Sequence, residues 1–255
     1  MGDFSFAGEH STVYHVKLLK SPISVLPGTR DKVITMPGRH GAIRMLPDLG
    51  ERNLPPMDCW LKANTLAQLY ERVDRLCAWL NPLRGAQQLI FDNTPDRYYL
   101  ALAAGGGLDA EKIARQGMFT ASFVCSDPFA YAVTPDVVTI TVSPYQHTQR
   151  GTAPADPLLR LQGVSTGAGG QQISISIDAQ TVTYRHVLAT DEWLEIDSAA
   201  KTVNRVVGAS RTRVIQHMEK PVFPQLAPGA NTITVAATGG ATWSRLEINC
   251  RNRWL

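Results

Sequence analysis

The sequence predicts a mainly β protein, with a mixed α+β first half and an all-β second half. Three observations lead to this fold class: one helical stripe near residues 65–81, short apolar runs separated by turn residues, and alternation of apolar and polar residues beyond about residue 136. A chain of 255 residues favours two domains. We expect them at residues 1–140 and 150–255, joined by the polar, proline-rich stretch 144–157.

The helix is the clearest single element. Thr65 and Gln68 form a capping-box pattern that satisfies free amides at the start of a helix. Pro82 ends it, because proline disfavours helical backbone at the residue before it. Apolar residues at helical spacing are expected to pack the helix on the first domain. They are Leu66, Leu69, Tyr70, Val73, Leu76, Cys77 and Leu80.

The rest of the first half reads as short strands. The pair Pro37-Gly38 marks a turn between two of them, and Gly105–Gly107 marks a loop. These glycines lack the following Gly-Lys-Ser/Thr of a phosphate-binding P-loop, so a flexible loop is the better interpretation. The expected strands are residues 12–19, 32–36, 42–46, 88–91, 98–103 and 118–125.

The second half alternates with a period of two. Ile173, Ile175 and Ile177 point one way along a strand, while the serines between them point the other way. Residues 232–235 and 246–250 repeat the pattern. Half-buried strands at this spacing, broken by Gly, Pro, Asn and Asp, predict an antiparallel β-sandwich.

Composition excludes several classes of protein. A net charge of +3 and a hydrophobic fraction of 44% exclude a disordered chain. The dispersed Arg and Lys residues do not form the basic stripe of a nucleic-acid binder. No apolar run is long enough to span a bilayer, and the first residues lack the pattern of a secretory signal, so we expect synthesis in a cytoplasm. Four scattered cysteines are therefore expected as buried thiols rather than two disulfides.

No constellation points to catalysis, a metal or a cofactor. The six histidines do not occur at metal-ligand spacing or beside cysteine, and no G-x-S-x-G nucleophile elbow is present. Glu195 and Asp197 lie on one strand face and would point in parallel, whereas a glycosidase needs two carboxylates flanking the bond. We expect a structural protein and not an enzyme.

A more specific indication comes from the order of several segments. FSFAGEHSTVYHV, MPGRHG, the run LCAWLNPLRGAQQLIFDNTPDRYYLALAAG and GMFTASFVCSDPFAY follow one another in the first half. EWLEIDSAAKTV, PQLAPGANTITV and RNRWL follow in the second. Over essentially its whole length, the chain resembles the distal tail protein (Dit) family of long-tailed bacteriophages.

The resemblance implies a structural virion protein at the tail tip. The N-terminal domain would carry its helix on a β-sandwich and assemble into a homo-hexameric ring, and the C-terminal domain would be a galectin-like β-sandwich outside it. The ring would join the tail tube protein to a tail-associated lysin, tail fibre or receptor-binding protein. DNA would pass through its central channel, without a membrane or cofactor.

Two pairs of residues are candidate contact sites. Arg39 and His40 project from the turn Met36–Gly41 and are candidates for an inter-subunit contact, against the plainer interpretation of a solvated hairpin. Trp193 and Trp243 are weak candidates for stacking on a sugar, although the H-x-N-x-R run of true galectins is absent. The alternative function is therefore a monomeric carbohydrate-binding module for host-surface attachment.

Overall fold

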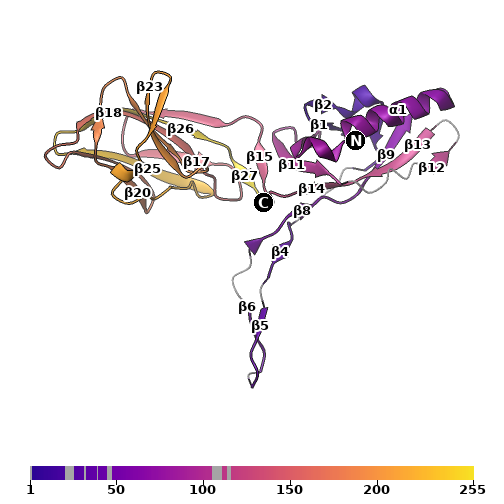
Figure 1. Cartoon of the computed structure of the whole chain (residues 1–255), viewed down its shortest axis with the longest axis horizontal. Helices are drawn as coiled ribbons and strands as arrows, with labels where there is room; N and C mark the ends of the chain where they lie inside the picture. The colour runs from indigo at the N-terminus through magenta and orange to yellow at the C-terminus, as the bar shows by residue number, and fades with distance from the viewer. Residues whose placement is uncertain are drawn as a thin grey trace. The chain divides into compact units, whose positions relative to one another are not determined.

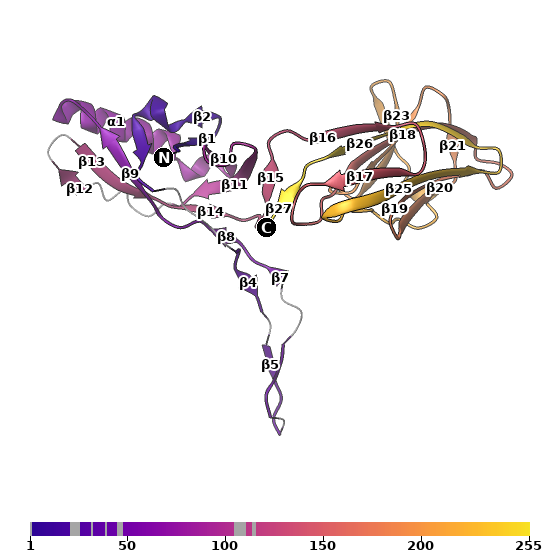
Figure 2. The same ribbon diagram turned by 180° about the vertical axis from the view of Figure 1, so that it is seen from behind.

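The computed structural model describes residues 2–20, 26–31, 33–38, 40–44, 48–104, 111–113 and 116–255. The chain forms two compact units, Met1–Val133 with Leu255, and Thr134–Trp254 (Figures 1 and 2). The division falls earlier than the expected domain limits of 140 and 150. Strands β16 (Asp136–Ile140) and β17 (Tyr145–Gln149) both belong to the second unit, so residues 144–157 are part of that unit rather than a linker between the two.

Two sheets and one helix make up the body of the first unit. The first sheet has the strand order β2-β1-β10-β11-β14-β8, with β15 also paired to β11, and the second has the order β12-β13-β9-β3. The first sheet comprises β1 (Phe4–Phe6), β2 (Glu9–His10), β8 (Arg52–Asn53), β10 (Gln87–Phe91), β11 (Arg97–Ala103), β14 (Phe123–Cys125) and β15 (Ala130–Ala132). The second comprises β3 (Val16–Leu18), β9 (Met57–Lys62), β12 (Glu111–Ile113) and β13 (Gln116–Ala121).

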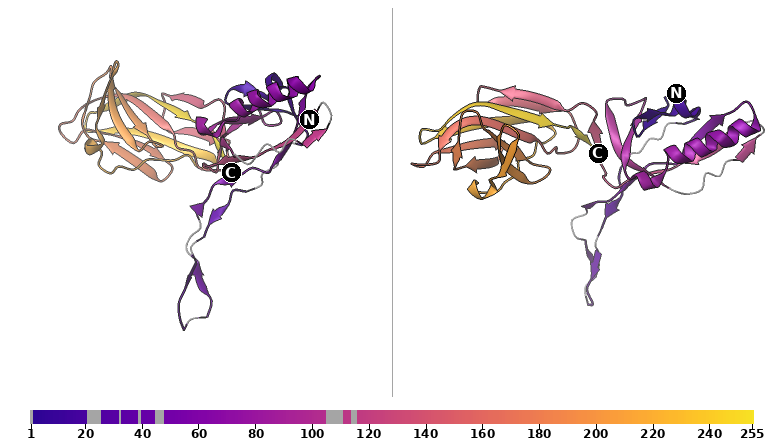
Figure 3. Two further views of the ribbon diagram at one scale, coloured as in Figure 1. Left: turned by 45° about the vertical axis from the view of Figure 1, so that its right-hand side comes forward. Right: turned by 45° about the horizontal axis from the view of Figure 1, so that its top comes forward.

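The helix α1 (Leu66–Trp79) confirms the predicted element and its cap. The Gln68 amide donates to the Thr65 hydroxyl at 3.2 Å, and the Gln68 side chain accepts from the Asn64 amide at 3.2 Å. Leu69 lies over the second sheet, where a Cβ on Gly117 would come within 3.3 Å of its Cδ1. Figure 3 shows the helix running beside the strands of this unit.

The packed face of α1 differs from the predicted stripe. Leu69 and Leu76 are buried as expected, and Val73 and Leu80 pack against the core. Trp79, which the stripe omits, is fully buried. The apolar residues that stay exposed despite the prediction are Leu66, Tyr70 and Cys77.

Two predicted strands take another form. Residues 12–19 begin as a short 3₁₀ helix, η1 (Ser11–Tyr14), and only then form β3. The His10 side chain accepts from the Thr12 amide at 3.3 Å and caps η1, which outweighs the strand preference of Thr12 and Val13. Residues 118–125 divide between β13 and β14, which lie in different sheets.

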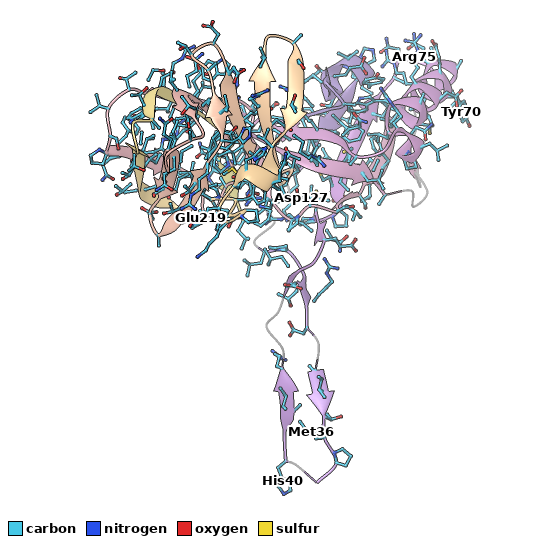
Figure 4. All side chains as sticks on the ribbon, turned by 60° about the vertical axis from the view of Figure 1, so that its left-hand side comes forward. Met36, His40, Tyr70, Arg75, Asp127 and Glu219 are labelled. Atoms are coloured by element: carbon cyan, nitrogen blue, oxygen red, sulfur yellow. The ribbon has the colours of Figure 1, made fainter. Side chains whose placement is uncertain are left out.

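A two-stranded arm leaves the body of this unit (Figure 4). It is built from two short pairs, β4 (Thr29–Arg30) with β7 (Asp48–Leu49) and β5 (Val33–Thr35) with β6 (Ala42–Arg44). The predicted strands 32–36 and 42–46 are therefore found in shortened form, and Lys32, Met45 and Leu46 lie outside the described residues. We call residues 29–49 the arm.

The second unit is the predicted antiparallel sandwich. One sheet has the order β16-β26-β18-β22-β23-β24, with β21 paired to β18, and the other has the order β17-β25-β19-β20. The further strands of the first are β18 (Leu158–Thr166), β21 (Val187–Leu188), β22 (Trp193–Asp197), β23 (Thr202–Val207), β24 (Ser210–Arg213) and β26 (Thr242–Cys250). Those of the second are β19 (Gln172–Ile177), β20 (Gln180–Tyr184) and β25 (Gly229–Thr238).

The core of the second unit follows the alternation seen in the sequence. Ile173, Ile175 and Ile177 are buried in one cluster with apolar residues of both sheets. Short 3₁₀ helices, η2 (Pro82–Arg84) and η3 (Ile215–His217), and a last short strand, β27 (Arg253–Trp254), complete the elements of the chain. No helix among the described residues is long and apolar enough to cross a membrane.

Candidate interaction surfaces

The arm exposes apolar side chains on both of its faces. Val33 is 51% exposed and Met36 is 46% exposed, and Ile34 is also exposed. An isolated two-stranded ribbon is marginally stable in water, and it presents open edges as well as these side chains. The arm therefore has the properties of a segment that packs on another surface.

One of the two predicted contact residues, His40, lies at the tip of the arm. His40 is exposed beside Met36 at the end of the arm (Figure 4). Gly38 and Gly41 adopt φ values of 79° and 83°, which glycine accepts without strain, so the turn forms where the sequence predicts it. Arg39 lies outside the described residues.

Trp193 stands among charged side chains on the outer face of the larger sheet in the second unit. Its ring centroid lies 4.6 Å from the guanidinium carbon of Arg160 and 4.5 Å from that of Arg245. Arg245 Nε also donates to Gln162 Oε1 at 2.9 Å. Two cations therefore already occupy the π system that a sugar would stack on.

Trp243 does not share this face, because the strand register shifts beside it. Gln162 pairs with Arg245 and Gly163 pairs with Trp243, so Ser244 is an extra residue in β26. The bulge reverses the alternation, and Trp243 packs against the hydrophobic core. The two tryptophans are thus not brought together as one platform.

The carboxylates of Glu195 and Asp197 serve separate structural contacts. Glu195 is buried, with Oε2 at 3.3 Å from Arg211 Nη2 and 3.7 Å from Arg160 Nε. Asp197 Oδ1 accepts from the amides of Ala199 and Ala200 at 2.9 and 2.8 Å, and thereby closes the turn after β22. Neither arrangement presents a pair of carboxylates across a substrate.

The structure brings together two of the six histidines, His186 and His217. Their rings stack with centroids 3.6 Å apart. Burial and the neighbouring imidazole lower the pKa of His217. Stacked rings direct their nitrogen lone pairs along parallel planes rather than toward one ion, and no group of three or more metal-ligating side chains occurs among the residues described.

A groove between α1 and η1 is the feature that the sequence did not reveal. It encloses about 640 Å³ and is lined by residues from three separate segments of the first unit. The helical period explains why the lining residues of α1 share one face. No pattern in the sequence indicates that this face lies beside η1 and η2. The lining residues are Glu9, Val13, Tyr14, His15, Gln68, Glu71, Arg72, Arg75, Ala78, Trp79 and Arg84.

Comparisons with known proteins find similarity to phage tail proteins. Residues 9–125 match the model of the phage tail protein RIFT-related domain. Among solved structures, the Dit protein (gp 19.1) of phage SPP1, described as a paradigm of the hub adsorption apparatus in phages infecting Gram-positive bacteria, superimposes with a TM-score of 0.78. That alignment covers 100% of both chains at 16% sequence identity, so it establishes the fold over the full length.

Weaker similarities complete the comparison. A chain of the activated phage P2 baseplate with calcium matches at a TM-score of 0.46 and 7% identity, covering 99% of this chain and 98% of that one. A chain of the strontium form matches at 0.49 and 7%, covering 98% of each. Such scores do not by themselves establish a shared fold. No curated protein matches the chain.

The matched model describes a phage tail protein domain, in line with the prediction of a structural protein rather than an enzyme. The Dit-like fold also confirms the predicted fold class, mainly β with one helix and antiparallel sheets in two regions. Residues 9–125 of the first unit thus match the phage tail protein RIFT-related domain, and the chain as a whole has the fold of the SPP1 Dit protein.

Proposed function

We propose that this protein is the distal tail hub of a long-tailed phage, in which six copies close into a ring at the tail tip. The ring joins the tail tube protein to the tail-associated lysin, fibre or receptor-binding protein and leaves a channel through which DNA passes. The observation that supports this most is the superposition on the SPP1 Dit protein over the full length of both chains.

The arm supports the assembly part of the proposal. A ring repeats one head-to-tail contact, so each subunit must offer two different surfaces that fit each other. The exposed apolar side chains Val33, Ile34 and Met36 gain burial if the arm packs on the neighbouring subunit. His40, at the tip of the arm, and Arg39, its neighbour in the sequence, are then the residues that we assign to the inter-subunit contact.

The alternative, a monomeric carbohydrate-binding module, has less support. Arg160 and Arg245 already contact the ring of Trp193, and Trp243 packs against the core. A sugar could stack on Trp193 only after displacing at least one guanidinium. The arm would also remain uncovered in a monomer.

The test is the mass of the full chain and of an arm variant, measured by light scattering over a concentration series. The wild-type chain is expected to reach six copies. Met36→Asp, which places a charge among the exposed apolar residues of the arm, is expected to shift the chain toward monomer. Val137→Asp, at an exposed apolar residue of the second unit, is the matched control and should leave the mass unchanged. A wild-type chain that stays monomeric at every concentration and binds a saccharide through Trp193 would favour the alternative.

A further inference from the structure

The groove between α1 and η1 combines a closed floor with charged walls. Trp79 and Tyr14 stack at the floor with ring centroids 4.4 Å apart. The groove gains apolar surface from Ala78 and from Val13, which is strongly exposed. Figure 4 labels Arg75 and Tyr70 on the exposed side of α1. At about 640 Å³ the groove has the size of sites that hold a short segment of chain or a small molecule.

Its two carboxylates are already engaged by neighbours in the groove. The Tyr14 hydroxyl donates to Glu9, and this hydrogen bond is the main cause of a raised pKa of Tyr14. Glu71 Oε1 accepts from Arg75 Nη2 at 2.7 Å, one helical turn along α1. Glu71 is therefore paired with a cation within the groove, whereas Glu9 is held by a neutral hydroxyl donor and keeps its charge.

Its cations are not balanced in the same way. Arg72 donates to the backbone carbonyl of Lys62, which leaves its charge uncompensated. The Arg84 guanidinium has no carboxylate partner among the described residues, and the exposed His15 lines the same groove. After the one internal ion pair, the guanidiniums of Arg72 and Arg84 outnumber the one remaining carboxylate, that of Glu9.

We propose that this groove binds an acidic peptide segment of a partner protein, with carboxylates on Arg72 and Arg84 and apolar side chains on Val13 and Tyr14. Guanidinium groups pair with carboxylates in two-point geometry. A peptide fits better than nucleic acid, because two guanidiniums within one groove are not an extended basic surface.

The site goes beyond the proposed hub function and rests on it in one respect, that a hub has partner proteins to bind. The groove belongs to the first unit alone and does not require the ring to be present. Binding of a peptide and assembly into six copies are therefore separate measurements on the same sample, and either result can fail while the other holds.

The experiment measures binding of a blocked hexapeptide of alternating glutamate and leucine to the full chain by fluorescence anisotropy. A lysine–leucine hexapeptide, a single-stranded hexanucleotide and inorganic phosphate are the comparison probes. We expect saturable binding of the acidic peptide that weakens with salt, since the contacts are charge pairs at a partly exposed site.

Two variants are expected to change the affinity in opposite directions. Arg84→Gln should weaken binding roughly three- to ten-fold, since it removes one charge-assisted contact. Glu71→Gln should strengthen binding about two-fold or more, because it releases Arg75 and removes a repelling charge. Arg213→Gln removes an equally exposed arginine from the second unit and should leave the affinity unchanged.

Opposite signs from two exposed residues cannot arise from loss of folding. Equal effects of Arg84→Gln and Arg213→Gln would overturn the proposal, because binding would then follow net charge alone. Equal or tighter binding of the oligonucleotide, of phosphate or of the lysine peptide would also overturn it, as would no binding of the acidic peptide.

Discussion

Tyr14 and Trp79 stack almost parallel, with ring centroids 4.4 Å apart and planes inclined by 10°. The contact joins η1 to the last turn of α1, and Trp79 Nε1 donates to the Phe6 carbonyl of β1 at 3.0 Å. Phe4 and Phe6 meet the other sides of the same indole. One residue thus connects the helix, the 3₁₀ turn and the first sheet, and it also forms the floor of the groove.

The helix should be sensitive to substitution at its buried face alone. Leu76→Ala is expected to cost about 2–5 kcal/mol in free energy of unfolding, because Leu76 is 1% exposed and its removal leaves a cavity. Leu66→Ala, at 43% exposure, is the matched control and should cost about 0.5 kcal/mol or less. Hydrogen exchange of the β9 and β13 amides reports the stability of this unit. Equal losses at both positions would mean that Leu66 is covered by another surface.

The four cysteines should differ sharply in reactivity. All four are free thiols, as predicted, but the expectation that all are buried is wrong for Cys77, which is exposed. Burial raises the pKa of Cys59 and Cys250 to about 12 and that of Cys125 to about 11. A thiol reagent at mild alkaline pH should therefore modify one equivalent in the folded chain and four after unfolding.

Cys77→Ser is the control for this measurement and should abolish the reaction of the folded chain. Rapid modification of a second thiol would contradict the burial described for the two cores. Protection of Cys77 in the concentrated wild-type protein would instead place it at a subunit contact.

The second unit should lose stability in mild acid through His147. This imidazole is 6% exposed, and its Nε2 has no hydrogen-bond partner among the described residues. Burial lowers its pKa below 6.5, an effect opposed by Asp136 and reinforced by Arg150. Below pH 6.5 the unfolded chain therefore binds a proton that the folded chain does not, so stability is complete above that pH and falls as the pH decreases.

Thermal unfolding followed between pH 7.5 and about pH 5 tests the sign of this effect. His147→Gln should flatten the dependence, whereas His40→Gln, at the exposed tip of the arm, should leave it in place. A second unit that becomes more stable in acid would contradict the description of His147 as buried and neutral.

The β-bulge should make Gly163 irreplaceable. A Cβ at this position would lie 2.4 Å from the Thr242 carbonyl oxygen, which is backbone and cannot turn aside. Gly163→Ala is expected to destabilise the second unit by about 1–3 kcal/mol and to displace Trp243. Val164→Ala, at the exposed neighbouring position, should cost much less, as measured by urea unfolding. A neutral Gly163→Ala would mean that β18 and β26 pair without the bulge.

Features encoded by neighbouring residues could be predicted from the sequence. The capping box at Thr65, the turn at Pro37-Gly38 and the alternation from Ile173 to Ile177 each depend on residues close in the chain, and the structure contains all three. The side chain of His10 is an exception, because its capping of η1 overrides the strand preference of the residues that follow.

Features that depend on distant partners could not be predicted. Ser244 becomes an extra residue only because β18 pairs with β26, so simple alternation along β26 does not reveal the core contact of Trp243. Trp79 falls outside the aliphatic stripe and is buried by Phe4 and Phe6 from another segment. The groove likewise joins η1 to α1, and its excess of cations appears only when residues from three separate segments are brought together and Glu71 is seen to be paired with Arg75.

The symmetry of the assembled protein tests the central claim most directly. Negative-stain images of the concentrated full chain, classified without imposed symmetry, should show closed rings with six-fold averages. Met36→Asp, examined at the same concentration, should reduce the fraction of rings. Images that contain only monomers or two-fold dimers would contradict the account, because neither uses the repeated head-to-tail contact that a ring hub requires.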